Sequence, residues 1–147
     1  MSESYDAYYD AVNNGHTEGL QESACKDPWC AYWYVKNVKG ADIGYYQKAA
    51  CKDPKWAYCF AKEIKGADID YCQEMACKDS YYAYCFANDI KGADIEYCQE
   101  AACKDPEWAY WFAVYVVGAD LEVCLEAVRG TEWEDEVRKM VIESGVG

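Results

Sequence analysis

The chain has 147 residues, of which 52% are hydrophobic and 16% aromatic, and this composition excludes a disordered or fibrous protein. Its formal net charge of -13 disfavours binding to nucleic acid or to an anionic membrane, because phosphate groups would be repelled. The length fits one domain, which we expect to span residues 1–147. The opening residues, MSESYDAYYD, lack the basic and apolar regions of a secretory signal, which predicts a cytoplasmic protein.

Residues 1–24 are predicted to form a degenerate first repeat that closes one end of an array. Residues 20–27 parallel residues 72–79, and Tyr5, Tyr8 and Tyr9 are expected to lie on a diverged first helix. The terminal unit of a repeat array is usually atypical, because one of its faces meets water.

Four clear repeats follow, at residues 25–50, 51–76, 77–102 and 103–128. A spacing of 26 residues separates their first cysteines and also their turn glycines, which are Cys25, Cys51, Cys77 and Cys103, then Gly40, Gly66, Gly92 and Gly118. A fixed period of this size indicates an array of supersecondary units.

Each repeat reads as two short helices. In the second repeat, Asp53 and Pro54 give a preferred N-cap and first helical residue, and Gly66 marks the end, so the first helix has about twelve residues with Lys65 in its last turn. A second helix follows the cap Asp68. Helices this short need packing partners. We therefore predict an all-α fold, a right-handed α-solenoid of tandem helix-turn-helix hairpins.

The last repeat and the tail depart from the pattern. Thr131 with Glu134 has the spacing of a capping box, which predicts a capping helix over residues 131–145. The last repeat carries Val114, Tyr115 and Val117 where the second has Lys62, Glu63 and Lys65. We expect the capping helix to cover these three side chains; the alternative is that they form a patch for self-association.

No constellation typical of an enzyme is present, and we expect no catalytic site, cofactor or metal. The chain has one histidine, His16, so cysteine–histidine nucleophiles and most zinc sites lack a base or ligand. The ten cysteines are interpreted as small buried residues rather than disulfides. A disulfide between cysteines at non-equivalent positions of the repeats, such as Cys72 and Cys77, is left as an alternative.

Two surfaces remain as candidates for binding a partner. The first is an aromatic face on the outward side of the first helices, made of Trp29, Trp33, Tyr81, Trp111 and Tyr115. Ordinary packing between neighbouring repeats is the alternative for these rings. The second is an acidic ridge on the second helices, made of Asp70, Glu74, Glu96, Glu100, Glu122 and Glu126. Such a ridge favours a basic partner, or serves solubility.

The repeated words DPxWAYxFAxxIKGADI and xYCQEAACKDP resemble short helical-hairpin arrays of phage, large-virus and metagenomic proteins, distantly similar to tetratricopeptide and Sel1-like solenoids. The resemblance implies the solenoid architecture, and no activity. Our leading hypothesis is a non-catalytic scaffold that binds another protein. One alternative is an acidic inhibitor that mimics nucleic acid towards a nucleic-acid-binding defence protein, in the host cytoplasm if the source is a phage or virus. A second is a cysteine-rich metal or redox protein.

Overall fold

A computed structural model describes residues 3–15 and 18–145, and in these residues every regular element is a helix. The chain divides into two compact units, residues 1–76 and 77–147, and the division falls between two repeats. The first unit contains α1 (Glu3–Asn14), α2 (Glu18–Ala24), α3 (Pro28–Asn37), α4 (Ile43–Ala50), α5 (Pro54–Glu63) and α6 (Ile69–Ala76). The second contains α7 (Ser80–Asp89), α8 (Ile95–Ala102), α9 (Pro106–Tyr115), α10 (Leu121–Val128) and α11 (Glu134–Glu143). The predicted all-α architecture of tandem hairpins is confirmed.

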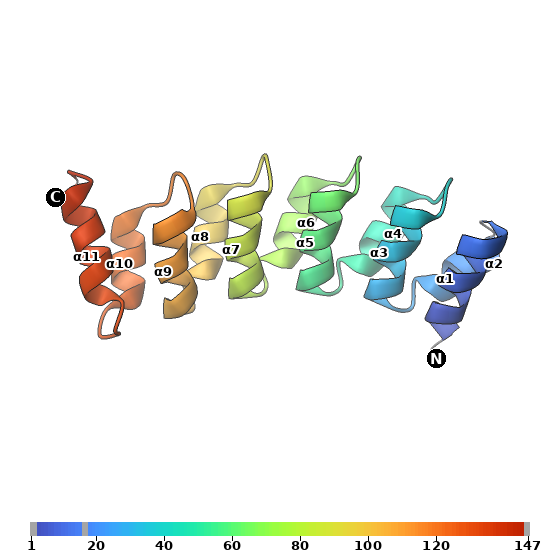
Figure 1. The fold of residues 1–147 in the computed structure, drawn as a ribbon, viewed down its shortest axis with the longest axis horizontal. Helices are drawn as coiled ribbons and strands as arrows, with labels where there is room; N and C mark the ends of the chain where they lie inside the picture. Colours follow the sequence, from blue (N-terminus) through green and yellow to red (C-terminus); the bar gives the residue numbers. More distant parts are fainter. Residues whose placement is uncertain (1–2, 16–17, 146–147) are drawn as a thin grey trace. The chain divides into compact units, whose positions relative to one another are not determined.

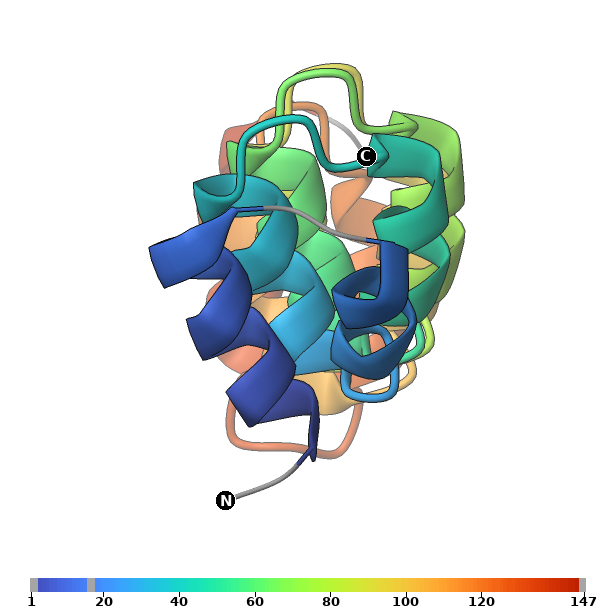
Figure 2. The same ribbon diagram turned by 90° about the vertical axis from the view of Figure 1, so that its right-hand side faces the viewer.

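Each repeat is a hairpin of two adjacent helices, and the odd-numbered helices also contact one another within a unit. In the first unit α1 packs on α3 and α3 on α5, while α2, α4 and α6 lie on the other side of their hairpins (Figures 1 and 2). In the second unit α7 packs on α9. The hairpins therefore form two layers within each unit, with the apolar stripes facing inward. None of the described helices has the length and apolar character needed to span a bilayer.

The aspartate caps form as predicted. The Asp53 side chain accepts a hydrogen bond from the Lys55 N–H at 2.9 Å, and Pro54 occupies the first helical position, where its missing N–H leaves no bond unmade. Equivalent bonds begin α3, α7 and α9, and a second set of aspartates caps α4, α8 and α10. Since each hairpin contains only short helices, these caps fix where both helices begin.

The first helix of the second repeat ends earlier than its sequence predicts. α5 stops at Glu63, Ile64 is extended, and the Ala67 N–H donates to the Ile64 carbonyl at 3.2 Å. This closes a tight turn in which Gly66 has φ +92°, a value that side chains rarely tolerate. Lys65 therefore lies in the turn and not in the last helical turn. The physical reason is that Ile64 leaves the helix in order to bury its side chain, which is 8% exposed.

A phenylalanine stripe forms the centre of each hairpin. Phe60, Phe86 and Phe112 occupy the same place in successive repeats and are fully buried, each with a buried alanine three positions earlier. The first full repeat has Tyr34 in this place, stacked on Tyr46 with ring centroids 4.6 Å apart. This stripe is the i, i+3 pattern that the sequence predicts for a helix packed on one side.

A buried glutamine connects neighbouring hairpins in the layer of second helices. Gln99, on α8, is 4% exposed; its Oε1 accepts from the Asp120 N–H at 2.9 Å and its Nε2 donates to the Asp120 carbonyl at 2.8 Å. In the first unit the Gln47 Oε1 accepts from the Asp68 N–H at 2.7 Å. Each contact holds the backbone of the residue that caps the next second helix. We refer to Gln47 with Asp68, and Gln99 with Asp120, as the glutamine clasps.

The predicted capping box at Thr131 is wrong. The hydroxyl oxygen of Thr131 accepts from the Trp133 N–H at 3.3 Å, while the Glu134 carboxylate reaches past it to accept from the Gly130 N–H at 3.0 Å. The helix begins at Glu134 with Trp133 as its N-cap, three residues later than expected. The turn after α10 occupies the intervening residues, because Thr131 bonds back to the Val128 carbonyl.

The capping helix does not cover the apolar residues assigned to it. α11 packs on α10 through Val137 and Val141, both buried, and Trp133 stacks on Tyr110 with centroids 6.0 Å apart. Val114, Tyr115 and Val117 are left 37%, 57% and 92% exposed, so the docking prediction is wrong. The reason is position: these side chains lie at the end of α9 and in the turn after it, away from the face that α11 contacts.

The loss of folding stability at acidic pH is expected to depend in part on the ionisation of Glu134. The hydrogen bond from the Gly130 N–H, followed by the charge of Arg138, holds the pKa of this carboxyl below its usual range. A lowered pKa in the folded state gives stabilisation that is present above the unfolded-state pKa and is lost as pH falls through the folded-state value. An NMR titration should show that Arg138→Met raises the Glu134 pKa only in part. Full recovery of the ordinary value would assign the effect to Arg138 alone.

Candidate partner-binding site

Part of the predicted aromatic face is buried in packing contacts. Trp29 stacks on Tyr5 with centroids 5.9 Å apart and meets the edge of Tyr8. Trp33 is half-buried against Tyr32, with the Lys36 ammonium 5.0 Å above its ring. Trp29 therefore packs between α1 and α3, as in the packing alternative that the sequence left open, whereas Trp33 contacts side chains of its own helix.

The other three aromatic residues lie in the second unit and are more open. Tyr81 is 40% exposed but contacts Trp108, at 4.6 Å between centroids. Trp111 is half-buried and stacks on Tyr115 at 5.6 Å, and Tyr115 is 57% exposed. Trp111 and Tyr115 lie together as a pair, next to Val114.

The acidic ridge lies on the surface as predicted, since all six of its carboxylates are exposed. They occupy the same two positions of successive second helices: Asp70 and Glu74 on α6, Glu96 and Glu100 on α8, and Glu122 and Glu126 on α10. Glu126 forms an ion pair with Arg129 at 2.8 Å. Among the described residues no lysine or arginine is within ion-pair distance of Glu96, Glu100 or Glu122. This leaves a dense negative charge on α8 and the start of α10.

A groove opens at the densest part of this ridge, in the second unit. Its volume is about 520 Å³, and it is lined by Glu96, Gln99, Glu100, Gly118, Asp120 and Val123. We call it the acidic groove. Gln99 and Asp120, which form one glutamine clasp, are both among its lining residues, so the groove lies where α8 and α10 are joined.

Two apolar side chains that the sequence analysis did not single out accompany the acidic groove. Val123 lines it and is 44% exposed, and Tyr97 is 43% exposed beside Glu96 on α8. They occupy one position of successive repeats, where Tyr45 and Tyr71 stand in the earlier copies. The sequence pattern that could have identified them is an apolar residue that recurs directly after the first acidic position of each helix in the acidic ridge. Since it interrupts the polar face, it marks a surface with both charge and apolar area.

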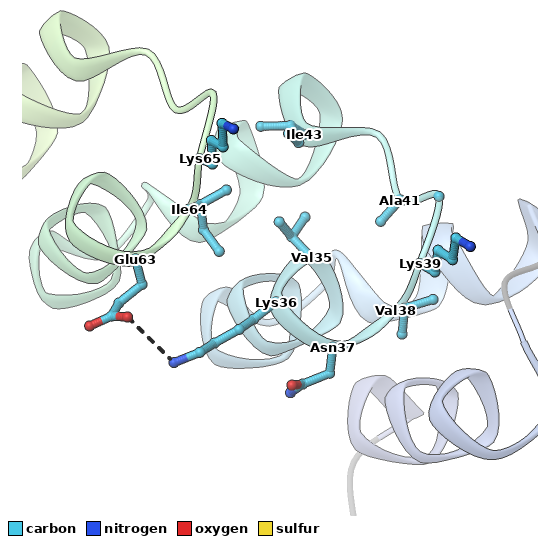
Figure 3. Close-up of a pocket in the computed structure, with 11 residues that line it drawn as sticks. Val35, Lys36, Asn37, Val38, Lys39, Ala41, Ile43, Glu63, Ile64 and Lys65 are labelled. Carbon is cyan, nitrogen blue, oxygen red and sulfur yellow. Dashed lines mark ion pairs between the residues drawn. The ribbon is translucent and has the colours of Figure 1, made fainter.

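A second hollow, of about 460 Å³, lies in the first unit between the turn after α3 and the end of α5 (Figure 3). The side chains of Val35, Ile43 and Ile64 extend into it, and the Lys36–Glu63 ion pair, 3.8 Å long, lies at one edge (Figure 3). The backbone around it comes from the carboxyl end of α3, whose carbonyls disfavour an anion. The hollow holds no nucleophile or paired acid and base, and we assign it to the geometry of the turns.

The cysteines lie together in a way that the sequence analysis missed. All ten lie in the described part of the chain and none is in a disulfide. The Sγ atoms of Cys51 and Cys72 are 3.7 Å apart, and those of Cys77 and Cys98 are 3.6 Å apart. The thiols of Cys103 and Cys124 form a hydrogen bond. Each of these thiol pairs is separated by 21 residues. The constant separation of 21 residues between the two cysteines of each pair is the sequence pattern that could have revealed these pairs. The sequence analysis considered a link between Cys72 and Cys77 instead.

Most thiols are held in the protonated form. Burial raises the pKa of Cys25 and of Cys30 to about 12, which leaves neither as a ready nucleophile. Cys77 and Cys103 differ, because the hydrogen bond that each makes with its paired thiol holds its pKa below the ordinary value. Among the described residues no group of three His, Cys, Asp or Glu side chains is placed to hold a metal ion, and His16 lies outside them.

Comparison with known proteins gave no match: no family model fits the sequence, and no curated protein or solved structure is significantly similar to it. The argument for function therefore proceeds from the geometry of these surfaces.

Proposed function

We propose that the protein is a non-catalytic repeat module that binds a basic segment of another protein in the acidic groove. The observation that supports this most directly is the juxtaposition of exposed Val123 with Glu96 and Glu100, which have no ion pair with a described basic residue. Burial of Val123 and of neighbouring Tyr97 would supply affinity, at about 25 cal/mol per Å² of apolar surface removed from water. The carboxylates would select lysine or arginine and accelerate the encounter.

The groove suits a side chain of this kind for a further reason. A lysine or arginine has an apolar stem and a charged end, so it can lie along Val123 while its charge meets Glu96 or Glu100. Tyr97 offers a ring face on which a guanidinium can stack. A purely apolar partner would bury two carboxylates of the groove, Glu96 and Glu100, without compensation, which is costly.

The test uses two synthetic peptides of equal length, one alternating lysine with leucine and one alternating glutamate with leucine. Calorimetry should show that the lysine peptide binds and the glutamate peptide does not. The double variant Glu96→Lys with Glu100→Lys is expected to weaken binding at least about tenfold, or 1.4 kcal/mol. A matched control, Glu107→Lys with Glu132→Lys, makes the same change in net charge at exposed sites outside the groove. Equal losses in both variants would contradict a site at the groove.

The regular carboxylates on α8 and α10, within the second unit, favour a second candidate, mimicry of nucleic acid towards a protein that grips phosphates. The two candidates differ in their use of Val123. Val123→Ser leaves every charge in place, so it should weaken a groove-bound segment and leave a mimic of phosphates unaffected. Binding that falls steeply with salt and is indifferent to Val123→Ser would replace the first candidate with the second.

A further inference from the structure

The Cys77–Cys98 pair lies next to a small cavity that gives one of its two thiols a path to solvent. This cavity, of about 220 Å³, is lined by Cys77, Tyr97, Glu100, Ala101 and Lys104. Cys77 is 8% exposed and Cys98 is fully buried, with their sulfurs 3.6 Å apart. A small molecule that enters the cavity would therefore meet Cys77 first, with a second thiol directly behind it.

We propose that Cys77 and Cys98 form a redox-active dithiol that is oxidised to a disulfide by a small hydroperoxide. The inference does not rest on partner binding at the acidic groove, although Glu100 lines both the groove and this cavity. Cys77 acts as the attacking thiol, because it faces the cavity, and Cys98 acts as the resolving thiol, because it touches Cys77 and no solvent.

The chemistry balances with one hydroperoxide. The Cys77 sulfur forms an S–O bond as the O–O bond breaks, which gives a sulfenic acid and releases the alcohol, or water from hydrogen peroxide. The Cys98 sulfur then attacks the sulfenic sulfur; an S–S bond forms, the S–O bond breaks, and the oxygen leaves as water with the thiol proton. Two thiols lose two electrons, and the peroxide gains them.

The surroundings suit a dithiol–disulfide couple. A dithiol and a disulfide are both neutral, so a buried site can hold either without the penalty of burying a charge. The charge of Asp94 opposes thiolate formation at both sulfurs, but the hydrogen bond between the two thiols lowers the Cys77 pKa, which eases formation of the one thiolate that the first step needs.

The Cys51–Cys72 pair provides an internal comparison, whereas Cys103, which is half-buried, has a lowered pKa and is paired with buried Cys124, meets the same criteria as Cys77. Cys51 and Cys72 have the same separation, at 3.7 Å, but both are fully buried. We expect Cys77–Cys98 to oxidise about tenfold faster, because susceptibility follows thiolate character and exposure. In the first full repeat Tyr46 replaces the second cysteine, so Cys25 has a phenol where a resolving thiol would be.

Peptide mapping separates this disulfide from its rivals. Reduced, folded protein is treated with hydrogen peroxide, alkylated and digested with trypsin without reduction. The expected product joins the peptide of residues 66–78 to that of residues 92–104. A bond between Cys72 and Cys77 would instead stay within the first peptide. Cys77→Ala should abolish the joined product, whereas Cys72→Ala should preserve it.

A second variant keeps the test independent of disulfide formation. In Cys98→Ala, Cys77 should accumulate as a sulfenic acid that a dione probe captures, and Cys85→Ala serves as a control in the same unit. Circular dichroism confirms that each variant is folded before treatment. An intrapeptide bond, oxidation of Cys51–Cys72 at an equal rate, or no capture at Cys77 in Cys98→Ala would each overturn the proposal.

Discussion

Replacing Phe86 with alanine is expected to lower the free energy of unfolding by about 3–5 kcal/mol. Phe86 is fully buried at the centre of its hairpin, and it follows a fully buried Ala83 that brings the helices close together. Truncation removes the transfer free energy of the ring and leaves a cavity that short, capped helices can fill only in part. Urea denaturation followed by circular dichroism provides the measurement.

The control for Phe86 is on the same helix. Asn88 is exposed and its amide bonds only to the adjacent Asp89, so Asn88→Ala is expected to change stability by less than about 0.5 kcal/mol. If the two substitutions destabilise the protein equally, Phe86 is not at the centre of the core, and the packing of the second unit described above is incorrect.

The second large effect is expected at a glutamine clasp. Gln99→Leu has nearly the same volume but removes both bonds to the Asp120 backbone. The part-buried Asp120 N–H is then left without a partner, whereas the Asp120 carbonyl keeps the hydrogen bond from the Cys124 N–H. Since an unsatisfied buried polar group costs about 1–3 kcal/mol, we expect a loss of about that size. Glu100→Gln, at the next position and exposed, should have little effect.

The clasp also predicts where the loss is felt. Hydrogen exchange should accelerate at the Asp120 amide and along α10, because the aspartate that caps α10 loses its anchor. The isosteric Gln99→Glu keeps the acceptor for the Asp120 N–H and removes the donor to its carbonyl. A uniform acceleration across the second unit, or none at Asp120, would contradict a local clasp between α8 and α10.

The features that depend on neighbouring residues in the sequence could be predicted from it. Asp53 with Pro54 and Asp68 mark the start of the two helices of a hairpin, and Ala57 and Phe60 have the i, i+3 spacing of one helical face. These follow from capping chemistry and helical period, which need no knowledge of the next repeat. Even here α5 ends two residues earlier than the sequence predicts, because burial of Ile64 competes with continuation of the helix.

The features that depend on how hairpins meet could not be predicted from a single copy of the repeat. The clasp of Gln99 and the pairing of Cys77 with Cys98 each join two different positions of the repeat. Aligning the copies of the repeat compares only equivalent positions, so it does not reveal such contacts. The covering of Val114 by the tail was predicted from composition and was wrong, because it depends on the direction in which α11 leaves α10. The acidic ridge could be predicted, but its groove required the spacing of α8 and α10.

Backbone chemical shifts from NMR test the central claim, which is that the chain folds into short helical hairpins that turn at repeated glycines. The structure predicts helical ¹³Cα shifts over residues 54–63, 69–76, 80–89 and 95–102, interrupted by non-helical shifts at Ile64 and Ile90, with a positive φ at Gly66 and Gly92. Helical shifts that run unbroken through either glycine, or extended shifts across these ranges, would contradict the account.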